Sequence, residues 1–117
     1  MIVACLDRGS DLLAVLRHTG RFGLNVLGSA QSQLALIFAR KGGAGKFASV
    51  PWYIDAEVPR IPGAAGFLAC AVNQIVPGGD PVIVMGRALI AETADRAPLT
   101  YHNRAFGTHA PFTRGAG

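Results

Sequence analysis

The sequence has few of the residues that mark several common classes of protein. It contains only two cysteines, Cys5 and Cys70, which are too few for a disulfide scaffold and lack the spacing of a metal site. Both stand in apolar, strand-like runs, so we expect buried and unreactive thiols. The three histidines do not cluster, and no HxxxH or CxxC pattern occurs, so no metal site is expected.

Long apolar runs and dense charge are also missing. No apolar run approaches the roughly 20 residues that span a bilayer, and Asp7 and Arg8 interrupt the apolar start too early for a signal peptide. Only 15% of the residues are charged, and the net charge of +4 comes from scattered lysines and arginines. We therefore expect a protein of the reducing cytoplasm that binds neither membrane nor nucleic acid. The small positive excess suits an anionic small molecule such as a nucleotide.

Apolar residues, glycine and proline are plentiful. Half of the 117 residues are apolar, and 15 glycines with seven prolines indicate the many tight turns of a β-rich fold. This length fits one domain with a modest core, so oligomerisation is a natural way to bury more surface.

The apolar pattern predicts five strands and two helices. The strands are expected at residues 2–6, 22–27, 66–76, 81–91 and 99–102, and the helices at residues 10–20 and 31–40. Residues 77–80 form a turn that joins two of these strands in a hairpin. Residues 55–65 are expected to be an exposed connector, and the tail from residue 108 to the end is expected to fray. This order of elements favours a small barrel flanked by two helices, mainly β in class.

The first helix carries the clearest local signals. Ser10 can cap its N-terminus, Asp11 suits the positive end of the helix dipole, and Gly20 can end the helix in the left-handed conformation. Four residues are expected to form its apolar face: Leu12, Leu13, Val15 and Leu16.

Two segments suggest ligand binding, and each also has a purely structural interpretation. Residues 41–46 read KGGAGK, but Arg40 and Phe47 stand where a nucleotide P-loop needs a glycine and a hydroxyl residue. Lys46 is then either an anion contact or a solvated lysine. Residues 101–107 gather aromatic and cationic groups at a strand end, where they either meet a planar, phosphate-bearing ligand or cover the barrel.

The chain resembles the flavin reductase-like family, the small reductase components of two-component flavin monooxygenases. The most informative stretch, SDLLAVLRHTGRFGLNVL, runs from Ser10 to Leu27. The phrases that carry the resemblance lie in order at residues 3–10, 19–27, 38–41, 46–52, 76–80, 83–86 and 98–102. Together they are distributed over nearly the whole chain. The resemblance implies an FMN-binding split β-barrel over residues 1–107, followed by a flexible tail at 108–117.

The resemblance also implies an activity and partners. The family transfers hydride from NADH or NADPH to FMN or FAD and releases the reduced flavin to a partner oxygenase. The hydride chemistry belongs to the cofactors, so no catalytic side chain is expected. The family's domain is usually a homodimer with flavin near the subunit interface.

Site residues are carried over by position from the same resemblance. Flavin would contact Cys5, Leu6 and Asp7 through its ring or ribityl chain, Ser10 through its phosphate, and Phe38, Lys46 and Phe47 as the closing wall. The nicotinamide would face Asp80, Tyr101, His102, Asn103, Arg104 and Phe106.

The chain departs from the family at three points. The family carries a further flavin-binding segment before the position of Met1, so the barrel is expected to be incomplete at its N-terminus. Leu12 stands where the family often has Ser or Thr, which weakens the case for phosphate binding. Pro81 stands where it usually has His, which weakens the case for nicotinamide use. The alternatives are a non-catalytic flavin- or haem-binding barrel, a deazaflavin-dependent barrel, and a truncated protein.

Overall fold

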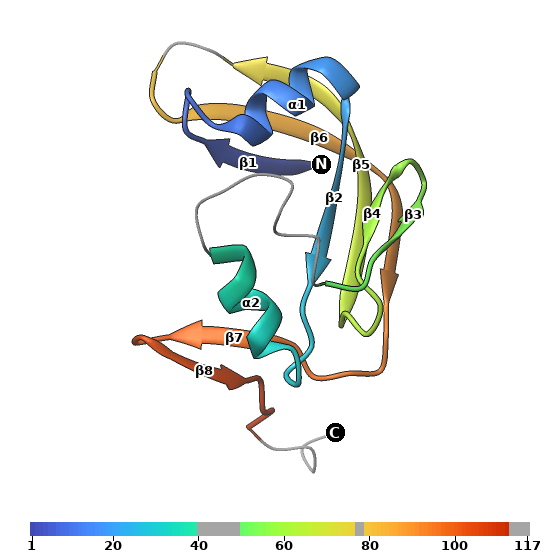
Figure 1. The fold of residues 1–117 in the computed structure, drawn as a ribbon, viewed down its shortest axis with the longest axis vertical. Coiled ribbons are helices and arrows are strands. Elements are labelled where there is room, and N and C mark those ends of the chain that lie inside the picture. The colour runs from blue at the N-terminus through green and yellow to red at the C-terminus, as the bar shows by residue number, and fades with distance from the viewer. Residues whose placement is uncertain (40–49, 77–78, 113–117) are drawn as a thin grey trace.

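The computed structural model describes residues 1–39, 50–76 and 79–112. These ranges contain eight strands and two helices, arranged as in Figure 1. In chain order they are β1 (Ile2–Leu6), α1 (Asp11–Thr19), β2 (Arg21–Val26), α2 (Ser32–Ala39), β3 (Tyr53–Asp55), β4 (Val58–Arg60), β5 (Gly66–Val76), β6 (Val82–Thr93), β7 (Leu99–His102) and β8 (Ala105–Thr108). The expected mainly β class with two helices is confirmed.

The main sheet has four antiparallel strands in the order β1-β6-β5-β2. Its centre is the long β5–β6 hairpin, which the sequence predicted. The register of this hairpin shifts between Ala69 and Cys70 and again between Val72 and Gln74. Such shifts bend and twist strands, and the two strands curve strongly along the molecule in Figure 1.

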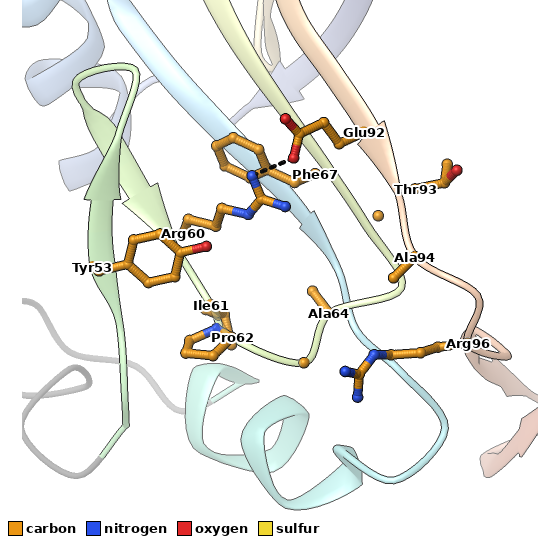
Figure 2. A pocket seen from close by; sticks show the side chains of 12 residues that line it. Tyr53, Arg60, Ile61, Pro62, Ala64, Phe67, Glu92, Thr93, Ala94 and Arg96 are labelled. Atoms are coloured by element: carbon orange, nitrogen blue, oxygen red, sulfur yellow. Dashed lines mark ion pairs between the residues drawn. The ribbon is translucent and has the colours of Figure 1, made fainter.

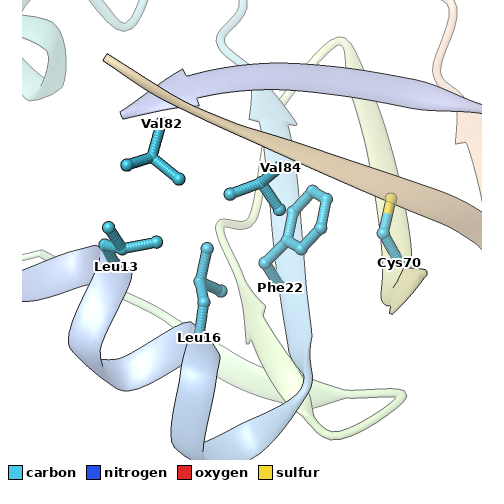
Figure 3. Packing of buried hydrophobic residues seen from close by; sticks show 6 residues of the cluster. All are labelled: Leu13, Leu16, Phe22, Cys70, Val82 and Val84. Atoms are coloured by element: carbon cyan, nitrogen blue, oxygen red, sulfur yellow. The ribbon is translucent and has the colours of Figure 1, made fainter. Parts of the chain in front are cut away.

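Helix α1 covers one face of this sheet. Ser10 caps it, accepting a hydrogen bond from the Leu13 N–H at 3.4 Å, and Gly20 ends it with a φ of 70°. The helix buries only two residues of the predicted apolar face, Leu13 and Leu16. The prediction was wrong for Leu12 and Val15, which are 52% and 53% exposed, because residues three apart on one stripe suffice to reach the sheet. Figure 3 shows the resulting cluster of Leu13, Leu16, Phe22, Cys70, Val82 and Val84.

The β3–β4 hairpin forms a second cluster at the other end of the sheet. Val58 packs with Phe67 and Ala69, and all three are buried. Strand β4 lies so close to β2 that a Cβ on Gly23 would come within 3.0 Å of Val58 Cγ2. The expected exposed connector at 55–65 was therefore wrong, since it contains a hairpin and the buried residues Val58, Ile61 and Ala65.

Helix α2 and the β7–β8 hairpin lie together at one end of the longest axis, with α1 at the opposite end (Figure 1). The predicted strand at 99–102 is confirmed as β7, and it pairs with β8. Helix α2, described along its whole length, has no buried residue despite its apolar sequence. Thr108 of β8 donates a hydrogen bond to the Pro98 carbonyl at 2.8 Å.

The two cysteines differ in their surroundings. Cys70 is buried in the first cluster, as expected, and burial raises the pKa of its thiol. Cys5 is exposed, so the prediction of a buried thiol was wrong there. The cause is its place on the edge strand β1, whose alternate residues face away from α1.

Candidate functional site

Two turns meet beside the N-terminus of α1. Leu6 pairs with Val82 at the end of β1, which brings the turn after β1 against the turn before β6. The Arg8 backbone N–H donates to Asp80 Oδ1 at 3.1 Å, and Arg8 Nη2 donates to the Gly79 carbonyl at 3.0 Å. The structure thus brings Asp80 next to the segment from Cys5 to Ser10 that the sequence predicted for flavin.

The donor groups at the start of α1 fit a phosphate. The Ser10 N–H bonds the Asp7 carbonyl at 2.9 Å, which fixes the turn, and Ser10 Oγ accepts the Leu13 N–H. The Ser10 hydroxyl keeps its own proton to donate, and the first turn of an α-helix presents N–H groups to an anion. Asp11 in the same turn opposes such binding with its charge.

An apolar row lies across the main sheet where β1 ends, on the face opposite α1. Cys5, Ile83 and Val76 lie side by side across β1, β6 and β5, and all three are exposed. They belong to the sheet face that α1 leaves uncovered. Apolar surface beside a few oriented polar groups is the usual composition of a cofactor site.

The predicted nicotinamide residues are divided in space. Tyr101 and Phe106 pair across the β7–β8 hairpin, with ring centroids 5.2 Å apart at 61°. Asn103 and Arg104 form its tip, with φ values of 52° and 63°. His102 precedes them, and all five side chains are exposed. This hairpin lies at the opposite end of the longest axis from α1, so the chain does not bring it to Asp80 (Figure 1).

Of the three remaining predicted flavin residues, the structure describes one. Phe38 is half-buried on α2. Lys46 and Phe47 lie outside the described residues, as does the whole 41–46 loop. The contact of these side chains with flavin stays a prediction.

The structure also has a hollow that the sequence did not indicate. It has a volume of about 180 Å³ and lies between the β3–β4 hairpin and the adjoining ends of β5 and β6 (Figure 2). Arg60 in its wall pairs with Asp55 at 2.8 Å and with Glu92 at 2.6 Å, and it stacks over Phe67 at 4.5 Å. The hydrogen bonds to Glu92 and Asp55 raise the pKa of Arg60.

This hollow does not suit a flavin. It is smaller than the roughly 300 Å³ at which ligand pockets begin, and two carboxylates already neutralise Arg60. The Arg60–Glu92 pair instead attaches β4 to β6 of the main sheet, while the Arg60–Asp55 pair lies within the β3–β4 hairpin. No signal in the expected connector pointed to it, because the contacts that build it are long-range.

The described parts of the chain contain neither a cluster of metal ligands nor a membrane-spanning helix. No group of three His, Cys, Asp or Glu side chains there could hold a metal ion. Neither α1 nor α2, the helices within the described ranges, is long and apolar enough to cross a membrane.

Known proteins resemble this chain over most of its length. Residues 1–110 match the model of the flavin reductase-like domain. The reductase component of a 4-nitrophenol 4-monooxygenase/4-nitrocatechol 2-monooxygenase from Rhodococcus opacus is 32% identical over 96% of this chain and 60% of its own. An FMN reductase (NADH), SmoA, from Agrobacterium fabrum is 36% identical over 74% of this chain and 49% of its own.

Solved structures agree with the fold. The NADH:FAD oxidoreductase SgcE6 from Streptomyces globisporus superposes with a TM-score of 0.82 at 26% identity, covering 93% of this chain and 68% of that one. The chain spans about half to three fifths of the length of the two curated relatives named above. The fold is therefore that of the flavin reductase split barrels, and the chain belongs to the flavin reductase-like domain family.

Proposed function

We propose that the chain is an NAD(P)H-dependent flavin reductase that takes FMN and supplies reduced flavin to a separate monooxygenase. The observation that carries this proposal is the family match over residues 1–110, which includes every predicted site residue. SmoA, named an FMN reductase (NADH), and the Rhodococcus reductase component support the cofactors and the kind of partner. A cytoplasmic location, and a flavin domain at 1–107 with a tail at 108–117, belong to the same proposal.

The chain's own residues would bind the flavin and the nicotinamide and orient them. The bound flavin and nicotinamide supply the hydride chemistry between them. Ser10 and the first turn of α1 hold the flavin phosphate, and the row with Cys5 and Ile83 supports the ring. Fixing both rings in a productive geometry is the protein's contribution to the rate.

A homodimer is the third part of the proposal. Within one chain the β7–β8 hairpin lies far from the flavin segment, yet it exposes Tyr101 and Phe106. A two-stranded sheet is only marginally stable in water on its own, so this hairpin gains most from a partner surface. In a dimer, the hairpin of one copy contributes to the site of the other.

An FMN titration followed by flavin fluorescence tests the binding step. We expect saturable quenching at micromolar protein, and then NADH oxidation in the presence of FMN above the rate of free flavin. NADPH and FAD in parallel give the preferences.

Other outcomes separate the alternatives. Flavin binding without turnover would favour the non-catalytic barrel, a reading that Pro81 supports because it replaces the family's usual histidine. Absence of binding by a protein that unfolds cooperatively would contradict the proposed function.

A further inference from the structure

Arg8 and Asp80 form a reciprocal contact between two turns. The Asp80 carboxylate accepts the backbone N–H of Arg8, while the Arg8 guanidinium donates to the backbone carbonyl of Gly79. Each side chain therefore fixes the other residue's turn, 72 positions apart in sequence. The Ser10 N–H bond to the Asp7 carbonyl continues this connection to the helix cap.

The contact matters because few other contacts among the described residues hold this end of α1. The helix has nine residues and buries only Leu13 and Leu16. These two side chains fix its distance from the sheet, whereas the direction of its first turn depends on the segment that enters it. That segment, Asp7 to Gly9, is exposed throughout.

We propose that Arg8 and Asp80 are positioning residues, which hold the turn before α1 so that Ser10 and the first-turn N–H groups point at the flavin phosphate. Asp80 then affects flavin binding by holding the turn of Arg8, and it does not contact the nicotinamide. This inference rests on the proposed function. It adds a residue, Arg8, that the predicted site did not include, and it gives Asp80 a different role there.

The two substitutions at Asp80 separate the effect of its charge from the effect of its hydrogen bond to the Arg8 N–H. If the carboxylate acted only as a charge near the bound phosphate, its removal would tighten FMN binding. If it holds the turn, Asp80→Ala weakens FMN binding despite the lost repulsion. Asp80→Asn retains an oxygen that accepts the Arg8 N–H, so it leaves the turn held.

The experiment measures the Kd for FMN and the KM for NADH in the full chain. We expect Asp80→Ala and Arg8→Ala each to raise the Kd for FMN by about three- to tenfold, the loss of one hydrogen bond. Asp80→Asn leaves the Kd near the wild-type value or lowers it. Arg17→Ala, which removes an exposed arginine from the last turn of the same helix, is the charge-matched control and leaves it unchanged. The KM for NADH stays at the wild-type value in all four variants.

Two results would overturn the inference. One is an unchanged or lower Kd for FMN in Asp80→Ala, and the other is a higher KM for NADH in that variant. Arg8→Ala keeps the carboxylate in place and so provides an independent test if Asp80→Ala does not fold.

Amide hydrogen exchange separates this inference from the proposed function. The Arg8 amide is expected to exchange faster in Asp80→Ala than in Asp80→Asn, with or without flavin. If the wild-type chain binds no FMN, the proposed function fails, and equal exchange in these two variants would show that the turn is not held by Asp80 either.

Discussion

Ser10 has two roles that a pair of substitutions can separate. Its side chain caps α1, and its hydroxyl proton faces the proposed phosphate. Ser10→Ala removes both functions, so we expect a loss of about 1 kcal/mol in the free energy of unfolding together with weaker FMN binding. Ser10→Asp keeps the cap, because aspartate is as good an N-cap as serine, but places a carboxylate against the phosphate.

Urea unfolding and FMN titration of both variants check this prediction. The expected pattern is near-native stability in Ser10→Asp with FMN binding abolished. Unchanged FMN binding in Ser10→Asp would place the phosphate away from the start of α1.

The two thiols should react at very different rates. Cys5 is exposed, whereas Cys70 is fully buried. We expect one thiol per chain to react with a disulfide reagent in the native protein and two after unfolding. FMN should slow the reaction of Cys5 if the flavin ring lies on its strand. Rapid reaction of both thiols in the folded state would contradict the packing around Cys70.

The same burial makes stability depend on pH in the alkaline range. Burial raises the pKa of Cys70, so the folded protein holds this proton more tightly than the unfolded chain does. The contribution of Cys70 is present below the ordinary thiol pKa and is lost as the pH rises above it. Cys70→Ala should flatten the alkaline fall in the free energy of unfolding, which urea titrations at several pH values would measure.

At the scale of elements, β2 and β6 pack through a glycine. A Cβ on Gly86 would lie 2.5 Å from Phe22 Cζ and 2.7 Å from Cε1. Gly86→Ala therefore overpacks the first cluster, and we expect it to cost about 1–3 kcal/mol of unfolding free energy. Gly66→Ala is the matched control, because its Cβ would meet its nearest atom at 3.6 Å.

A second substitution checks the cause. Phe22→Leu removes the ring atoms that clash, so the double variant should lose less than the two single losses added together. Urea denaturation of all variants measures this coupling. Additive losses would mean that the strain at Gly86 does not come from Phe22.

Elements with local signals were predicted well, and elements held by distant contacts were not. Helix α1 has a cap and a glycine stop, and the β5–β6 hairpin has a marked turn between two apolar runs. The β3–β4 hairpin has strands of three residues and turns through Ala56 and Glu57, both at positive φ. Such turns usually carry Asn or Gly, so no turn signal in the sequence predicted this one.

The hairpin forms because contacts from elsewhere stabilise it. Asn25 on β2 accepts the Ile61 N–H at 2.9 Å and donates to the Pro59 carbonyl at 3.2 Å. Neither bond has a sequence signature. The candidate site shows the same division: the predicted residues before α1 gather with Asp80, while the contact of Arg8 that joins them was not foreseeable from spacing.

The whole molecule is more extended than its length requires. Its radius of gyration is 15.6 Å, against about 13 Å for a compact domain of this size. The difference arises because α2 and the β7–β8 hairpin project from one end of the sheet (Figure 1). Their apolar side chains remain accessible, with Tyr101 65% and Phe106 40% exposed.

This surface leads to a prediction about assembly. If a second copy covers the hairpin, Tyr101→Glu should shift the protein from dimer toward monomer in sedimentation velocity and weaken FMN binding in parallel. Val15→Glu is the matched control, since Val15 is an exposed apolar residue on α1 at the other end of the molecule. The proposed dimer would be contradicted by a chain that sediments as a monomer at every concentration and whose FMN affinity is unaffected by Tyr101→Glu. Each flavin segment would then function without the hairpin of a second copy.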